Sequence, residues 1–295
     1  MTSAGLAIGS RKRAILLVCT GSALFVVAAA LVKAIARDIP VMEIAFFRSL
    51  VASIILLPML RRHGGLQALR TRRPWGHVVR VLAGFSSMVT LYYGYGTLPL
   101  ATVTALSFAM PLVLSILSIP MLGERVGPLR ALAVVTGLIG VLVMLRPWQQ
   151  FAHDADALPL IPVIAVLAGV FGWAIAMISI RQMGAQGERS VTIVLWFSLG
   201  CSALAALLSI PVWVTPSATT LLGVIGVGAV STIAQLVMTE GYRSADSALV
   251  APFEYGAILY TTVLGAVIWG EIPDLWSLIG IAILVASGVV VWRSA

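Results

Sequence analysis

Two ionisable residues, Arg48 and Glu254, lie inside long apolar stretches of this sequence. If these stretches are membrane helices, an arginine or aspartate at mid-helix costs about 2.5 to 3.5 kcal/mol unless a partner or water accommodates it. Arg48 could attract the carboxylate of a solute, or could clamp its helix to neighbouring carbonyl groups. Glu254 lies beside Pro252, which frees a backbone carbonyl, and beside Tyr255. It could bind an amine or a proton, or make only a local contact.

A second set of candidates recurs at helical spacing. Phe85, Met88 and Tyr92 follow one another at intervals of three and four residues, so they share one face of a helix. The corresponding stretch in the second half of the chain carries Gln235 and Thr239. An aromatic wall opposite a polar wall would suit an amphipathic solute, whose ring stacks and whose head forms hydrogen bonds. Ordinary helix packing accounts for the same pattern.

Three further large or charged residues lie within apolar stretches. Trp173 is near the middle of one stretch and shares a face with Met177, so it either packs against a partner helix or lines a cavity. Trp196 is assigned to packing. Arg80 lies about one turn inside its stretch, and we expect its side chain to extend to the cytoplasmic surface.

The elements that carry these residues are expected to be membrane helices. Of the 295 residues, 60% are hydrophobic and 10% are charged, whereas soluble domains carry about 25% charged residues. A helix needs about 20 apolar residues to cross a bilayer. Ten spans of this kind are predicted, over residues 14–33, 41–60, 75–96, 100–121, 129–146, 158–180, 190–210, 219–240, 248–270 and 275–292.

The basic residues between these spans predict the orientation. With the N-terminus in the cytoplasm, 14 of the 19 lysines and arginines fall on the cytoplasmic side, 3 on the other side and 2 within helices. Because cytoplasmic loops carry the excess of basic residues, both termini are predicted to be cytoplasmic. The net charge of +8 therefore indicates membrane topology, and no nucleic-acid partner is expected.

The two halves of the chain resemble each other. Tyr95 aligns with Tyr242 without a gap, and Gly123-Glu124 then coincides with Gly270-Glu271. We predict two repeats of five helices, over residues 1–147 and 148–295. An odd number of helices makes the second copy enter the membrane from the opposite face, and inverted repeats of this kind are typical of transporters.

One pattern recurs in both halves: a mid-helix proline, a helix that closes in Gly-Glu, and a glycine-rich helix. Its residues are Pro111, Gly123-Glu124 and Gly137 with Gly140, then Pro252, Gly270-Glu271 and Gly280 with Gly288, alongside Phe47-Arg48-Ser49-Leu50. In this pattern the chain resembles the EamA-type branch of the drug/metabolite transporter superfamily. The resemblance implies an all-α basket of ten helices with a central cavity lined by helices 1 to 4 and 6 to 9. It is strongest to bacterial exporters of aromatic and neutral amino acids or related metabolites. The two Gly-Glu glutamates are expected to cap or pair with the next helix.

Other classes of function are less well supported. The three histidines, His63, His77 and His153, lie in loops or at a helix end, and the chain has no G-x-x-x-x-G-K-[ST] phosphate loop. We therefore expect no enzyme, no cofactor and no metal. A multidrug exporter of the same superfamily and a membrane scaffold are the alternatives.

The prediction is a secondary transporter in the bacterial plasma membrane, a monomer or homodimer that exports a small molecule by alternating access. Its site is predicted to comprise Arg48, Phe85, Met88, Tyr92, Trp173, Gln235, Thr239, Glu254 and Tyr255.

Overall fold

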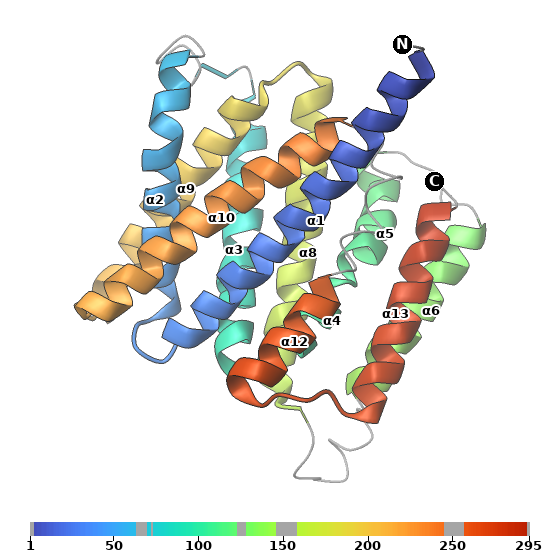
Figure 1. The fold of residues 1–295 in the computed structure, drawn as a ribbon. Coiled ribbons are helices and arrows are strands. Elements are labelled where there is room, and N and C mark those ends of the chain that lie inside the picture. The colour runs from blue at the N-terminus through green and yellow to red at the C-terminus, as the bar shows by residue number, and fades with distance from the viewer. Residues whose placement is uncertain are drawn as a thin grey trace.

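The computed structural model describes residues 3–62, 70–71, 73–122, 128–145, 158–244 and 257–293, and these residues form helices and short connections without a strand (Figure 1). The N-terminal half contains α1 (Ser3–Ile35), α2 (Val41–Arg62), α3 (Pro74–Thr97), α4 (Leu100–Ser107), α5 (Met110–Leu122) and α6 (Pro128–Leu145). The C-terminal half contains α8 (Leu160–Ala185), α9 (Ser190–Ser209), the 3₁₀ turn η2 (Ile210–Val212), α10 (Ala218–Ser244), α12 (Ala257–Trp269) and α13 (Leu275–Arg293).

Each predicted span overlaps at least one of these helices. Five helices, α1, α2, α8, α9 and α10, have the length and apolar character to cross a membrane. The total of ten crossings stays a prediction. The fourth span is not one continuous helix, since it divides into α4 and α5 at Phe108 and Ala109. Pro111 lies in the first turn of α5, where its missing N–H is tolerated, whereas inside a helix it would break the hydrogen-bond ladder.

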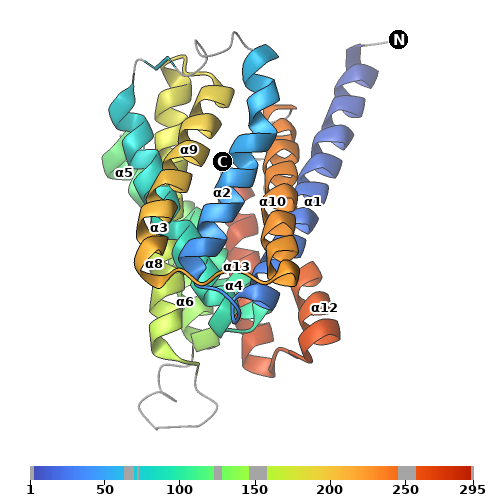
Figure 2. The ribbon, with the colours of Figure 1, turned by 90° about the vertical axis from the view of Figure 1, so that its left-hand side faces the viewer.

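The helices of the two halves pack together in pairs. α1 packs against α10, α3 against α8, α2 against α9 and α6 against α13. In the two repeats, α1, α2 and α3 correspond to α8, α9 and α10. Exchanging the halves therefore turns the α1–α10 pair into the α8–α3 pair, which is also present. The chain descends through α1 and rises through α8 in Figure 1, and Figure 2 shows α1 and α10 side by side. Neither half could therefore bury its helices alone.

Close approach of α3 and α8 depends on glycine. A Cβ on Gly172 would lie 2.7 Å from the carbonyl oxygen of Ala83 and 3.4 Å from the backbone nitrogen of Ser87. Such backbone atoms cannot move aside without displacing the whole helix. Small residues allow membrane helices to approach in this way.

We expect Gly172→Ala to destabilise the bundle by about 1 to 3 kcal/mol, because the added methyl group forces α3 and α8 apart. Thermal unfolding in detergent measures this effect. Gly184→Ala in the same helix is the matched control, because no atom of another described segment lies within 4 Å of its added Cβ. Equal melting temperatures for the two variants would contradict the close contact.

Candidate functional site

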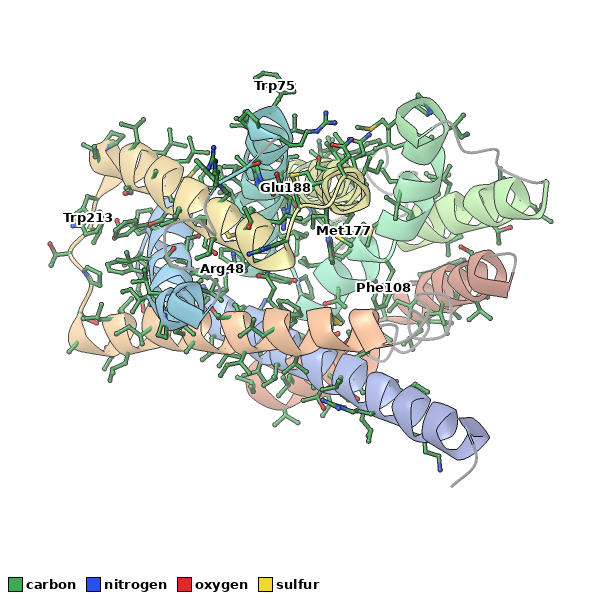
Figure 3. The ribbon with its side chains drawn as sticks, turned by 90° about the horizontal axis from the view of Figure 1, so that it is seen from above. Arg48, Trp75, Phe108, Met177, Glu188 and Trp213 are labelled. Carbon is green, nitrogen blue, oxygen red and sulfur yellow. The ribbon has the colours of Figure 1, made fainter. Side chains whose placement is uncertain are left out.

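Arg48 lies in the interior of the bundle, between α2, α3 and α10 (Figure 3). Its Nη1 donates to the Sδ atom of Met88 at 3.1 Å, and its Nη2 donates to Oε1 of Gln235 at 3.5 Å. Thioether sulfur is a weak acceptor, and 3.5 Å is a long hydrogen bond. Among the described residues, its buried Nε has no acceptor. The guanidinium group is therefore held in place but keeps donor capacity for a ligand.

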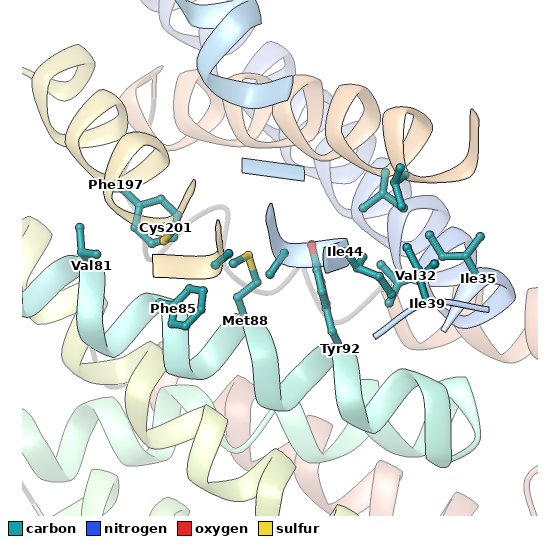
Figure 4. Packing of buried hydrophobic residues seen from close by; sticks show 14 residues of the cluster. Val32, Ile35, Ile39, Ile44, Val81, Phe85, Met88, Tyr92, Phe197 and Cys201 are labelled. Carbon is teal, nitrogen blue, oxygen red and sulfur yellow. The ribbon is translucent and has the colours of Figure 1, made fainter. Parts of the chain in front are cut away.

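The predicted apolar wall is present on α3. Phe85, Met88 and Tyr92 are all buried and belong to one hydrophobic cluster, which also contains Phe197 and Cys201 of α9 (Figure 4). The Tyr92 hydroxyl lies close to the side chain of Ser231 on α10. The prediction that these three residues share one face is confirmed, and this face lies beside Arg48.

The opposite wall on α10 is polar at Gln235 and Ser231. Thr232 does not contribute a free hydroxyl, because its side chain donates to the Gly228 carbonyl at 2.6 Å. Thr239 belongs to α10, but its side chain lies outside the described residues. The structure thus joins Arg48, Met88, Tyr92 and Gln235 through hydrogen bonds or direct packing.

Arg80 differs from its prediction. Its guanidinium carbon lies 3.8 Å from the centre of the Phe197 ring, and Nη1 is packed against Gly84, one turn further along α3. The side chain therefore points along α3 toward Met88, away from the end of the helix. The ring of Phe197 offers a cation–π contact, and the absence of a side chain at Gly84 leaves room for the guanidinium group.

Among the described residues, Trp173 forms no hydrogen bond with Arg48. Trp173 is half-buried on α8. α8 packs on a different face of α3, where Gly169 approaches Thr90 and Gly172 approaches Ala83. Glu254 and Tyr255 lie outside the described residues. Their roles, and that of Trp173, stay predictions.

Two acidic residues join the halves at opposite ends of the bundle. Glu43 at the start of α2 accepts a hydrogen bond from the backbone N–H of Val214 at 2.6 Å. Glu188, between α8 and α9, accepts one from the hydroxyl of Thr71 at 2.6 Å and lies 4.0 Å from His77. In each case an acid at or just before the start of the second helix of one half binds the connection between the second and third helices of the other half. The shared position of an acid near the second helix of each half was a signal that sequence reasoning missed.

Glu271 of the second Gly-Glu pair anchors a third contact between the halves. Its Oε1 lies 2.7 Å from Nζ of Lys33 on α1, and its Oε2 accepts the backbone N–H of Leu100 at 3.0 Å. Gly270 allows the turn that places it there, because its φ of +69° is favourable only for glycine. The predicted capping role is confirmed, but the capped helix is α4 of the other half, not the next helix. Glu124 lies outside the described residues.

Comparison with known proteins agrees with this architecture. The model of the EamA-like transporter family matches the chain twice, over residues 12–146 and 160–293. A solved crystal structure, 20% identical, superposes with a TM-score of 0.64 over 97% of this chain and 96% of that one, which supports the fold. The predicted duplication is thereby confirmed, whereas the boundary at residues 147 and 148 stays a prediction.

Several bacterial relatives are named as transporters of small molecules. The S-adenosylmethionine uptake transporter of Rickettsia prowazekii is 31% identical over 247 residues, covering 82% of this chain and 80% of the relative. The riboflavin transporter of Vibrio cholerae is 31% identical over 253 residues, with 84% and 82% covered. The pseudopaline exporter of Pseudomonas aeruginosa is 27% identical over 288 residues, with 96% and 97% covered. The duplicated helices and these relatives establish that the chain is a membrane transporter that belongs to the EamA-like transporter family.

Proposed function

We propose that this chain exports an amino acid, aromatic or neutral, or a related small metabolite that carries a carboxylate. The observation that carries the proposal is the Arg48 guanidinium group, which lies beside an apolar wall and bonds only a thioether and a distant amide oxygen among the described residues. A solute carboxylate is a much stronger acceptor and can accept two parallel hydrogen bonds from one arginine.

The remaining contacts suit the rest of such a solute. Phe85, Met88 and Tyr92 offer apolar and aromatic surface for its body, and Gln235 offers an amide for its polar head. Trp173, Thr239, Glu254 and Tyr255 are proposed to complete the site. A positive charge fixed at Arg48 would repel a cationic drug, which disfavours the multidrug alternative.

The arrangement of the halves supports the proposal of alternating access. The Glu43–Val214 hydrogen bond joins the two halves at one end of the bundle, and the Glu188–Thr71 hydrogen bond joins them at the other end. Breaking the contact at one end while keeping the other would expose the site to one side of the membrane. We propose that both termini are cytoplasmic. α1 begins and α13 ends toward the same end of the bundle (Figure 1), and Arg73 and Arg189 occupy connections at that end.

The test is counterflow in vesicles containing the purified protein, as monomer or homodimer. Labelled phenylalanine, leucine and glutamine are offered outside while the unlabelled amino acid is held inside, with and without a pH gradient. We expect at least one of them to accumulate transiently above empty vesicles. Labelled S-adenosylmethionine, which carries a carboxylate, and labelled riboflavin, which carries none, are offered in the same way. Accumulation of riboflavin, with no flux of any amino acid or of S-adenosylmethionine, would contradict the proposal.

A further inference from the structure

We infer that Arg80 is a second anion-binding residue, and that the preferred solute carries two acidic groups separated by a short apolar stem. This inference rests on the proposed transport site. Among the carboxylate-bearing solutes of the proposed function, it favours those with a second acidic group, which are related to the neutral amino acids but are not members of that class. It predicts that acidic amino acids or related dicarboxylates are bound in preference to neutral amino acids.

The first support is the environment of the Arg80 side chain. Its guanidinium group is stacked on Phe197, and among the described residues its buried Nε has no hydrogen-bond acceptor. Stacking uses the face of the planar group and leaves the N–H groups at its edge available. A ligand oxygen in the plane of the group would satisfy them without disturbing the contact with the ring.

The second support is that the guanidinium groups of Arg48 and Arg80 lie near each other, at the two ends of one apolar strip on α3. The two positive charges lie close enough to repel each other. Phe197, over which Arg80 lies, belongs to the same hydrophobic cluster as Met88, to which Arg48 donates. Phe85 and Met88 lie between the two arginines along α3, since Arg80 points toward Gly84 and Arg48 bonds Met88. Two cationic groups therefore flank an apolar strip.

The third support is the lack of a protein counter-charge in the part of the chain that the structure describes. The salt bridges there join Lys33 to Glu271 and, if the histidine is protonated, His77 to Glu188; none reaches Arg48 or Arg80. Two like charges in a low-dielectric interior are unfavourable unless anions compensate them. A solute with two carboxylates would neutralise both arginines and place its methylene groups against Phe85 and Met88.

Glutamate and glutamine provide a matched pair of probes, because they have nearly the same shape and differ in one negative charge. We expect the wild-type protein in vesicles to bind glutamate with at least about tenfold higher affinity than glutamine, as measured by counterflow. This is the effect of the charged hydrogen bonds between Arg80 and the second carboxylate. Equal affinities for the two would overturn the inference without any mutation.

Arg80→Gln is the direct variant. We expect it to lower glutamate affinity about tenfold or more and to leave glutamine affinity within about twofold, because the variant removes only the partner of the solute's second acidic group. Arg80→Lys should restore part of the preference, because it restores the charge without the planar fork. An unchanged glutamate-to-glutamine ratio in Arg80→Gln would remove Arg80 from the site.

Gly84→Ala tests the position of Arg80 while keeping its charge. The added Cβ would collide with Nη1 of Arg80 and lie 2.7 Å from Cε2 of Phe197, so the guanidinium group must move. We expect the preference for glutamate to fall as in Arg80→Gln. Gly226→Ala is the control, because among the described residues of other segments its added Cβ meets Leu31 alone, at an ordinary 3.5 Å. A preference that Gly84→Ala leaves intact would contradict the inferred geometry.

The proposed function and this inference fail in different ways. If glutamine and phenylalanine are carried in an Arg48-dependent manner but glutamate is not preferred, the inference is wrong and the proposed function holds. If no amino acid is carried and Arg48→Ala changes nothing, the proposed function itself is wrong.

Discussion

Arg48→Ala is expected to lower transport of the preferred amino acid by about 10- to 100-fold in kcat/KM. The loss corresponds to the roughly 1.5 to 3 kcal/mol that a hydrogen bond to a charged group contributes. Its acceptors in the protein, Met88 and Gln235, are weak or distant, so the substrate carboxylate is the partner whose loss matters most. Initial rates of counterflow in vesicles, over a range of substrate concentrations, measure the change.

Three controls separate binding from folding in this experiment. Arg37→Ala removes an exposed arginine from the connection between α1 and α2 and should leave the rate unchanged. Met88→Leu removes the sulfur acceptor at similar volume and should cost less than about tenfold in kcat/KM. Thermal unfolding of Arg48→Ala should stay close to wild type, because removing the side chain also removes an incompletely paired buried charge. Wild-type rates in Arg48→Ala would show that Arg48 is a structural clamp.

Glu271→Gln is expected to destabilise the protein by about 3 kcal/mol. The glutamine keeps an oxygen to accept the N–H of Leu100 but leaves Lys33 without its counter-charge. Removing one partner of a buried pair costs about 3 to 5 kcal/mol, and the lower end applies because the side chains are 11% and 22% exposed. The melting temperature of the purified protein, with refolding checked, reports the change.

The double variant Lys33→Gln with Glu271→Gln decides whether charge pairing is the cause. It should recover much of the stability lost in Glu271→Gln, because no unpaired charge remains. Lys33 also lies 5.6 Å from the centre of the Trp269 ring and donates to the Leu98 carbonyl at 2.8 Å, so recovery will be incomplete. Additive losses would show that the ion pair contributes nothing beyond its separate hydrogen bonds.

Much of the architecture was predictable from local sequence. The apolar stretches predicted where the helices lie, because burial in lipid depends on the composition of each segment. The aligned Gly-Glu pairs predicted the duplication, which the double family match confirms. The common face of Phe85, Met88 and Tyr92 followed from the helical repeat.

The errors have identifiable physical causes. Hydropathy marks residues 100 to 121 as one span but does not locate the break, which precedes α5 because the first turn of that helix tolerates Pro111. Arg80 was expected to reach the surface, because its depth in the helix permits it. Phe197, 117 residues later in the chain, instead supplies a ring that holds its guanidinium group inside the bundle.

By itself, the sequence determined that this protein is a duplicated, helical membrane transporter, since hydropathy, helical period and repeat similarity are properties of single segments. Only the tertiary structure decided that Arg48 meets Met88 and Gln235, that Glu271 caps α4, and that Arg80 turns inward. The hydrogen bonds of Arg48 and Glu271 join residues 40 to 187 positions apart in the chain. The position of Arg80 depends on the ring of Phe197 in another helix. These contacts depend on which faces of two interlocked halves pack together, and no local pattern in the chain specifies that packing.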